Sequence, residues 1–339
     1  MAFKAQQHPS PALFFDTVNA YQRTQALKGA IDLDLFTLIG AGKKTAAALG
    51  KECGAPERGV RILSDYLTVI GFLTKKGTRY ALTPDSALFL DRKSPACLCS
   101  ATDFLLSPTL TEGFRDVAEL VRNGGTLQKD GGTVAPENPI WVKFAKAMVP
   151  MMALPARQMA QLALGSSREK MRVLDIAAGH GIFGIEFARA NPNAEVVALD
   201  WPNVLDVARE NATAAGVHRR HSLLPGSAFN VDYGTDYDIV LLTNFLHHFD
   251  FKTCVTLLKK VRAALKKGGR AVTLEFVPDE SRVTPPAAAT FSLMMLGTTP
   301  QGDAYTFSEL SAMCKAAGFA KNTLHPLPPT LQQVVVSVK

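Results

Sequence analysis

The sequence predicts a mixed α/β protein in which a mostly parallel, doubly wound sheet follows a mostly helical front part. From residue 171 onward, short apolar runs alternate with helix-like segments. Such alternation is typical of a parallel sheet covered by helices on both faces. A glycine-rich turn follows the first of these strands, and an acidic residue ends the second. Before residue 165 the apolar residues recur mostly at helical spacing.

The glycine-rich turn lies in residues 171–201, MRVLDIAAGHGIFGIEFARANPNAEVVALDW. The first strand runs into Asp175, and small residues follow at every second position, Ala177, Gly179 and Gly181. Small residues let the backbone approach a ligand, and the start of the next helix offers free N–H groups. The second strand ends on Asp200, about 20 residues beyond the turn, where a carboxylate can accept hydrogen bonds from both hydroxyls of a ribose. We therefore expect a nucleotide-binding crevice.

The front part combines helices with one hairpin. Residues 10–40 have helical spacing, and residues 46–53 and 56–70 form two further helices before a hairpin that ends near residue 82. Helix, helix and hairpin in this order are typical of a winged helix, which often binds DNA. The second of these helices carries two acids and two bases, Glu57, Arg58, Arg61 and Asp65. This balance attracts phosphate weakly, so we expect a structural role and no nucleic-acid partner.

Residues 98–165 are predicted to be helical, with a polar loop at 123–139. Four residues from this segment and from a later Met-rich helix are candidates for substrate binding: Phe144, Met148, Met152 and Met294. Thioether side chains adapt well to flat apolar ligands. Ordinary core packing is the alternative for each of them.

The remaining chain continues the alternation of helices and strands. We expect helices at 204–215, 253–265 and 306–317, and strands near 223–229, at 238–242, 270–276, 320–325 and 332–338, with Lys267-Gly268-Gly269 ending the second helix. Ligands of such sheets bind at the carboxyl ends of the strands. Five polar residues fall at such ends: Asp175, Asp200, Ser227, Asn244 and Glu275.

Composition narrows the class of protein. The 339 residues suffice for two domains, and we divide the chain into residues 1–100, 101–165 and 166–339. No apolar run reaches the roughly 18 residues of a membrane span, and no signal peptide is visible. Five scattered cysteines without paired spacing predict reduced thiols in a cytoplasmic protein and no metal site. The net charge of +7 permits acidic partners without requiring them.

The glycine turn, Leu199-Asp200-Trp201-Pro202-Asn203-Val204, the His247 segment and Lys267-Gly268-Gly269 together resemble a known family. They look like the S-adenosylmethionine-dependent small-molecule O-methyltransferases related to plant caffeic acid and bacterial polyketide methyltransferases. The resemblance covers residues 10–338 in the same order. It implies a Rossmann-like class I methyltransferase domain, S-adenosyl-L-methionine as the cofactor, and a role in secondary metabolism. It also implies a homodimer formed through the winged-helix front domain.

The resemblance implies roles for individual cofactor residues. Asp175 and Gly179 match positions near the methionine end of the cofactor, and Asp200 matches the ribose acid. Gly181, in the same turn, is also predicted to bind the cofactor. Trp201 matches a residue that flanks the adenine. Ser227 replaces a usual aspartate near the adenine, with Ala228 and Phe229 beside it, and Asn244 belongs to the same predicted site. Thr243 replaces a frequent lysine.

His247 matches the catalytic base of the family, and Glu275 matches the first of two glutamates that flank it. A histidine suits this role because the acceptor hydroxyl loses its proton as the methyl group arrives, and imidazole titrates in the required range. His248 replaces an aspartate of the plant enzymes and is expected to be structural. The second glutamate falls near Ala304, so that either Asp303 substitutes for it or the group is absent.

The leading hypothesis is methyl transfer to a hydroxyl of a small aromatic or polyketide-like metabolite. One alternative keeps the fold and cofactor but assigns C-methylation or a non-methylating activity, motivated by Ser227, Thr243 and Ala304. A second is a winged-helix DNA-binding regulator. A third is an NAD(P)-linked oxidoreductase, because Gly179, Gly181 and Gly184 also fit dinucleotide spacing.

Overall fold

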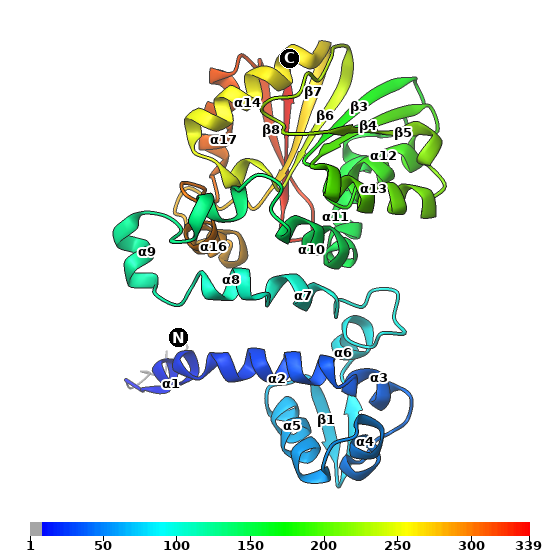
Figure 1. The fold of residues 1–339 in the computed structure, drawn as a ribbon, viewed down its shortest axis with the longest axis vertical. Coiled ribbons are helices and arrows are strands. Elements are labelled where there is room, and N and C mark those ends of the chain that lie inside the picture. The colour runs from blue at the N-terminus through cyan, green and yellow to red at the C-terminus, as the bar shows by residue number, and fades with distance from the viewer. Residues whose placement is uncertain (1–8) are drawn as a thin grey trace, which may run out of the picture. The chain divides into compact units, whose positions relative to one another are not determined.

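The computed structural model describes residues 9–339, and its internal contacts divide the chain into two compact units, Met1–Thr102 and Asp103–Lys339. Figure 1 shows the elements of both units. The sequence predicted three parts, with boundaries at residues 100 and 165. In the structure the helical residues 103–165 are not a separate part but form one unit with the sheet that follows them.

The first unit has the predicted order of helices and a hairpin. Its elements are α1 (Ala12–Val18), α2 (Ala20–Asp32), α3 (Leu35–Gly40), α4 (Ala46–Cys53), α5 (Glu57–Val69), β1 (Leu73–Lys76), β2 (Arg79–Leu82) and α6 (Pro84–Phe89). The Thr45 hydroxyl accepts a hydrogen bond from the Ala48 N–H and so caps the start of α4. Gly54, at φ 63°, ends the same helix in the left-handed conformation that favours glycine. The apolar faces meet in a core that includes Phe36, Leu49 and Tyr80.

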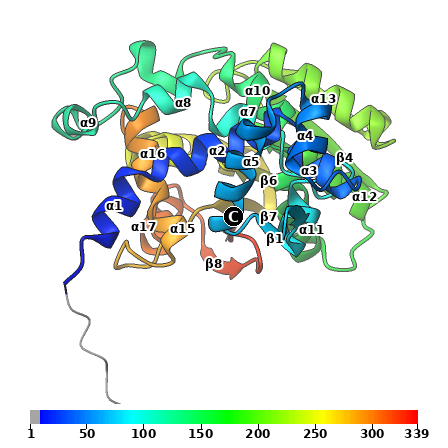
Figure 2. The ribbon, with the colours of Figure 1, turned by 90° about the horizontal axis from the view of Figure 1, so that it is seen from below.

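The second unit begins with a helical segment. It contains α7 (Ala101–Leu105, which starts at the boundary), α8 (Pro108–Glu112), α9 (Val117–Asn123), the 3₁₀ helix η1 (Lys129–Val134), α10 (Ile140–Ala147) and α11 (Val149–Leu164). The Thr126 hydroxyl donates to the Gly297 carbonyl, and the Thr133 hydroxyl donates to the Thr298 carbonyl. These contacts hold the 123–139 loop beside α16 (Phe291–Thr298), which is far away in the sequence; α9 and α16 lie close together in Figures 1 and 2.

A seven-stranded sheet forms the centre of the second unit. Its strands are β3 (Met171–Ile176), β4 (Ala194–Asp200), β5 (His221–Pro225), β6 (Tyr237–Thr243), β7 (Leu265–Glu275), β8 (Lys321–Pro326) and β9 (Gln333–Val338), in the order β5-β4-β3-β6-β7-β9-β8. The first five are parallel, and β9 pairs antiparallel with both β7 and β8. The prediction of a mostly parallel α/β sheet is confirmed.

Helices cover both faces of this sheet. The helical elements between and after the strands are α12 (Ile182–Ala190), α13 (Pro202–Ala214), η2 (His218–Arg220), η3 (Leu246–His248), α14 (Phe251–Ala264), α15 (Pro286–Ala289) and α17 (Phe307–Ala316). Helices α14 and α17 pack together, whereas α11, α12 and α13 form a separate group on the other side of the sheet (Figure 1). Buried Leu174, Val240 and Leu258 belong to a large core cluster between the sheet and α14.

The start of β7 differs from the prediction. Lys267-Gly268-Gly269 was expected to lie between a helix and a strand that starts at residue 270, but β7 already begins at Leu265. Leu265 pairs with Tyr237, and the register then shifts so that Ile239 pairs with Arg270. Gly268, at φ 74°, accommodates this irregularity. The glycines therefore form a bulge within the strand.

The sheet order places a crevice beside β3, since β4 lies on one side of it and β6 on the other. Ligands of open α/β sheets bind at the carboxyl ends of strands at such a reversal of strand order. Within residues 9–339, no helix has the length and hydropathy needed to cross a membrane.

Candidate active site

A cavity of about 600 Å³ lies at the carboxyl ends of β3, β4 and β6. Its wall is mostly aromatic and thioether side chains, contributed by the helical segment, the strand ends and α16. These are Phe104, Trp141, Phe144, Met148, Met151, Met152, Phe229, Phe245, Phe249, Phe276, Phe291, Met294 and Met295. Such a wall suits a flat apolar ligand.

The glycine turn closes one end of the cavity. Gly179 lines the cavity, and its φ of 57° lies in the left-handed region that favours glycine. Its N–H donates a hydrogen bond to the Asp200 carboxylate over 2.8 Å. Gly184 brings α12 close to β4: a Cβ there would lie 2.7 Å from Val196 Cγ1 and 3.0 Å from Asp175 Oδ2. A side chain at position 184 would therefore push the helix away from the strand.

Asp175 and Gly181 were also predicted to touch the cofactor, but neither lines the cavity. Asp175 is fully buried, and its Oδ2 accepts from the Gly184 N–H over 3.0 Å. Burial raises its pKa to about 7, although the Gly184 hydrogen bond acts in the opposite direction. Gly181 starts α12 and packs against Ala208. Both residues shape the turn from behind.

Asp200 lies at the end of β4 and lines the cavity. Its two oxygens accept from the N–H groups of Gly179 and Trp201, over 2.8 Å and 2.7 Å. Burial raises its pKa to about 6, although these hydrogen bonds favour the charged form. A carboxylate has about four lone-pair sites, so Asp200 keeps acceptor capacity for the hydroxyls of a ribose. Ser227, Ala228 and Phe229, after β5, line the cavity as well.

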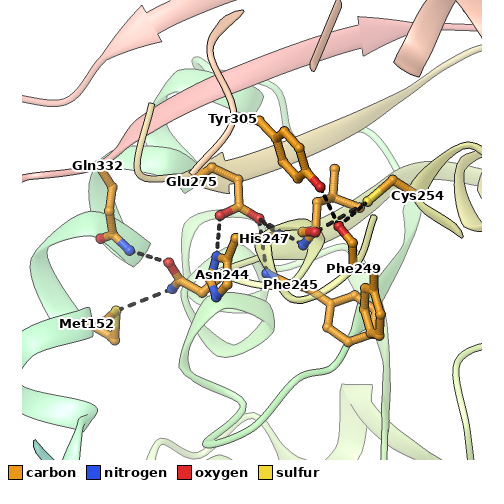
Figure 3. Close-up of polar contacts among 10 residues, drawn as sticks. Met152, Asn244, Phe245, His247, Phe249, Cys254, Glu275, Tyr305 and Gln332 are labelled. Carbon is orange, nitrogen blue, oxygen red and sulfur yellow. Dashed lines mark hydrogen bonds and ion pairs between the residues drawn. The ribbon is translucent and has the colours of Figure 1, made fainter. Parts of the chain in front are cut away.

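His247 and Glu275 form a buried pair. His247 lies on η3 after β6, Glu275 ends β7, and His247 Nδ1 lies 2.5 Å from Glu275 Oε2 (Figure 3). The other carboxylate oxygen accepts from the N–H groups of Phe245 and Leu246, over 3.1 Å and 2.8 Å. Because a carboxylate only accepts, Nδ1 carries the proton and the lone pair of a neutral imidazole lies on Nε2. His247 lines the cavity and Glu275 lies behind it.

The backbone that carries His247 is held from several directions. Asn244 adopts a positive φ of 54°. Its side chain accepts a hydrogen bond from the Gln332 amide and donates one to Met152 Sδ over 3.6 Å (Figure 3). Tyr305 donates to the Phe249 carbonyl over 2.5 Å. This loop is therefore held by residues from three segments: α11, the connection between β8 and β9, and the segment before α17. Asn244 lines the cavity, as expected for a site residue.

All four predicted substrate residues, Phe144, Met148, Met152 and Met294, line the same cavity. Phe144 stacks on the ring of His180 with 5.6 Å between centroids and contacts Trp141 edge-on. His180, whose pKa burial lowers to about 4, is a neutral support for Phe144 beside the turn. Sequence analysis gave no role to His180, although its position inside the glycine turn was a usable signal.

Asp303 does not occupy the place of the second glutamate near His247. Its carboxylate lies 3.1 Å from the Arg282 guanidinium, which also pairs with Glu309 over 2.5 Å. Ala304 is fully buried and offers no polar side chain. Among the described residues, Glu275 alone places a carboxylate on the His247 ring.

Sequence analysis missed several lining residues. Phe104, Trp141, Phe276 and the 133–136 segment reach the cavity from three different parts of the chain. The aromatic residues near 104 and 141 were visible, but only the fold shows that they face the strand ends. Gln332, which holds Asn244, carried no sequence signal.

Comparisons with known proteins place this chain in the methyltransferase class. Residues 136–320 match the family model of the O-methyltransferase domain, and residues 15–92 match that of the O-methyltransferase dimerisation domain. The chain belongs to the O-methyltransferase family. The predicted family, enzyme class and helical front domain are therefore confirmed.

Three relatives illustrate this similarity. A crystal structure of a protein from Nostoc punctiforme PCC 73102, assigned as an O-methyltransferase, is 54% identical, covers 98% of this chain and 100% of that chain, and has a TM-score of 0.95. The 3-hydroxy-5-methyl-1-naphthoate 3-O-methyltransferase of Streptomyces sahachiroi is 28% identical over 97% of this chain and 95% of its own. Human N-acetylserotonin methyltransferase, solved with S-adenosylmethionine, shares the fold at 21% identity and a TM-score of 0.85, covering 99% of both chains.

Proposed function

We propose that this O-methyltransferase transfers the methyl group of S-adenosyl-L-methionine to a hydroxyl of a small aromatic or polyketide-like metabolite, with His247 as the general base. One observation carries the proposal: an imidazole held by a buried carboxylate lines an aromatic and Met-rich cavity next to the glycine turn. The hydroxynaphthoate acceptor named for the Streptomyces relative also supports an aromatic substrate.

The family supports the cofactor that the sequence predicts, and the residues of this chain fit it. Asp200 has spare acceptor capacity for the ribose hydroxyls, and Gly179 and Trp201 lie beside it at the cavity wall. Ala228 and Phe229 offer apolar surface for the adenine. When bound, the cofactor supplies a methyl group activated by a positively charged sulfur.

The hydrogen bond between His247 and Glu275 supports the proposed base role of His247. Glu275 fixes the proton on Nδ1 and orients the ring, so the Nε2 lone pair is free to take the proton of an acceptor hydroxyl. Glu275 also stabilises the imidazolium that forms, through the same contact. The apolar wall excludes water and holds the acceptor ring in a fixed orientation, which lowers the entropic cost of aligning the reacting atoms.

We also propose that the protein acts as a homodimer. The dimerisation-domain match supports this assembly. Helix α1 and the start of α2 expose several large apolar side chains, among them Leu13, Phe14 and Tyr21, which are 79%, 63% and 64% exposed. An apolar face of this kind is typical of a protein interface.

Product analysis tests the proposed function. The purified protein would be incubated with methyl-labelled S-adenosylmethionine and a panel of naphthols and hydroxylated polyketide-like ring compounds, and the products examined by mass spectrometry and NMR. We expect the label on a phenolic oxygen. Label on carbon, or no transfer despite cofactor binding, would contradict the proposal and favour the alternative activities.

A further inference from the structure

The cavity wall contains no lysine or arginine among the residues that the structure describes there. Its one formally charged residue is Asp200, which lies at the nucleoside end and is negative. The remaining polar lining residues are hydroxyl, amide and imidazole groups, namely Ser227, Asn230, Thr133, Thr243, Asn244, His247, His248 and Thr298. A permanent anion on the acceptor would therefore find no cationic partner in the wall.

The two histidines do not replace the missing cation. Any positive charge on His247 is neutralised by Glu275, whose carboxylate lies 2.5 Å from its ring, so the pair offers no net positive charge to an anion. Burial first, and the neighbouring His247 second, lower the pKa of His248 well below its ordinary value. The rings of His247 and His248 lie 4.3 Å apart, so a charge on one opposes a charge on the other. His248 is therefore neutral.

Basic residues on adjoining elements are directed elsewhere. Lys143 and Lys146 lie on α10, which contributes Phe144 to the wall, but both lysines are exposed to solvent. Lys260 donates to the carbonyls of Ala228 and Phe229, over 3.1 Å and 3.0 Å, and lies over the Tyr233 ring. Its ammonium is satisfied by these groups and does not line the cavity.

The hydroxyl donors beside α16 are also occupied. Thr133 donates to the Thr298 carbonyl over 3.0 Å, and Thr298 donates to the Met294 carbonyl over 2.8 Å. Around Phe291, Met294 and Met295 the wall consequently offers apolar surface and little hydrogen bonding. A charged group buried without a partner is strongly disfavoured.

We infer that the methyl acceptor is an uncharged, flat hydroxyarene, and that this cavity rejects acceptors carrying a carboxylate, sulfate or phosphate. This inference rests on the proposed function and narrows its substrate class. It separates this chain from the Streptomyces relative, which is named for a naphthoate acceptor.

A matched pair of ligands tests the inference without depending on turnover. The full chain, loaded with S-adenosylhomocysteine, would be titrated calorimetrically at pH 8 with the methyl ketone and the carboxylate of the same hydroxynaphthalene, which have similar shape and differ in charge. We expect the ketone to bind at least about a hundredfold more tightly, because the carboxylate must be buried unpaired. Equal or tighter binding of the carboxylate would overturn the inference.

A variant that adds a cation provides the reciprocal test. Met294→Lys should improve carboxylate binding relative to the ketone by about tenfold or more, since it places an ammonium in the wall. Met294→Gln, of similar length and uncharged, should not. Retained binding of S-adenosylhomocysteine shows that each variant is folded. If Met294→Lys still bound S-adenosylhomocysteine but preferred the ketone over the carboxylate as strongly as wild type does, the inference that the cavity selects acceptors by charge would be contradicted.

The same titration distinguishes a failure of the proposed function from a failure of the charge inference. If neither naphthalene bound although S-adenosylhomocysteine did, an aromatic acceptor would be excluded, and both the proposed function and this inference would fall. If the carboxylate bound and was methylated on oxygen, the proposed function would stand and only the charge inference would be overturned.

Discussion

At the scale of single residues, the buried Glu275 carboxylate is what turns His247 from an ordinary polar residue into a candidate base. One of its oxygens accepts from the His247 ring, and the other accepts from the Phe245 and Leu246 backbone. Glu275 therefore fixes the ring, its tautomer and the loop that carries it. In the proposed mechanism the acceptor hydroxyl contacts the imidazole, and Glu275 acts from behind it.

Glu275→Gln should lower kcat by about 10²–10⁴-fold. A glutamine amide can donate to Nδ1, which would move the imidazole proton to Nε2 and remove the lone pair that faces the acceptor. Cofactor affinity should stay close to that of the wild type, because Glu275 does not line the cavity. Steady-state kinetics with a calorimetric control would check this. Full activity in the glutamine variant would show that the tautomer is not set by Glu275.

Asp200 should make cofactor binding depend on pH. Burial raises its pKa to about 6, and ribose hydroxyls donate to the ionised form. Affinity should therefore be constant above pH 7 and fall as the carboxyl protonates, by about tenfold per pH unit below its pKa. Titration with S-adenosylhomocysteine from pH 5 to 8 measures this. Asp200→Asn should bind more weakly at pH 8 by about 1–3 kcal/mol and lose the pH dependence; an identical slope in both proteins would place the titrating group elsewhere.

Some of these residues could be predicted from the sequence and others could not. Asp200 was predicted because it ends an apolar strand, where ligands of such sheets bind. His247 was predicted because the segment that carries it resembles the family's base-carrying segment. Gln332 could not be found, because its partner Asn244 is 88 residues away. The pairing of Asp303 with Arg282 is equally non-local, so the sequence left open a role for Asp303 beside His247.

At the scale of elements, the close approach of α12 to β4 shapes the glycine turn. Gly184 has no room for a side chain between Val196 and Asp175, and its N–H binds the buried Asp175 carboxylate. The turn therefore depends on packing behind the cavity as much as on the residues that face it.

Gly184→Ala should lower the free energy of unfolding by about 1–3 kcal/mol, since the new Cβ forces α12 away from the strand. Cofactor affinity should fall with it. Gly59→Ala is the matched control, because Gly59 lies within α5 and a Cβ there meets nothing within 4 Å. That substitution should be neutral or stabilising by about 0.5–1 kcal/mol. Chemical denaturation of both variants gives the comparison; a Gly184 variant as stable as the Gly59 variant would refute the packing explanation.

Element types were predictable because the hydrophobic period changes clearly between helices and strands. The bulge in β7 was not. Two glycines after a helix-like segment favour a helix end, and only pairing with Tyr237 and Ile239 shows that the strand has already started.

At the scale of the whole molecule, the alternation of strands and helices was enough to predict the fold class, and the front unit was recognisable from its winged-helix order. The cavity could not be built from sequence, since Phe104, Trp141 and Met294 reach it from widely separated elements. The charge of the cavity wall could not be predicted either, because the absence of lysine and arginine from it is visible only once the lining residues are known.

The apolar face of α1 and α2 predicts dimer dissociation on charge substitution. Leu13→Glu combined with Phe14→Glu should shift the protein from twice the chain mass of 36.5 kDa to the monomer mass, because two charges would be buried at the interface. Val283→Glu, at an exposed apolar site in the second unit, is the control. Sedimentation velocity distinguishes the species. A dimer that survives the double substitution would place the interface on another surface.

The most direct measurement of the chemistry is the single-turnover rate of methyl transfer in His247→Ala, alongside wild type and the exposed-site control His218→Ala. We expect the His247 variant to lose about 10²–10⁴-fold in rate while binding S-adenosylhomocysteine as tightly as wild type, and the His218 variant to retain full activity. A His247→Ala protein that transfers the methyl group at the wild-type rate would contradict the assignment of His247 as the base.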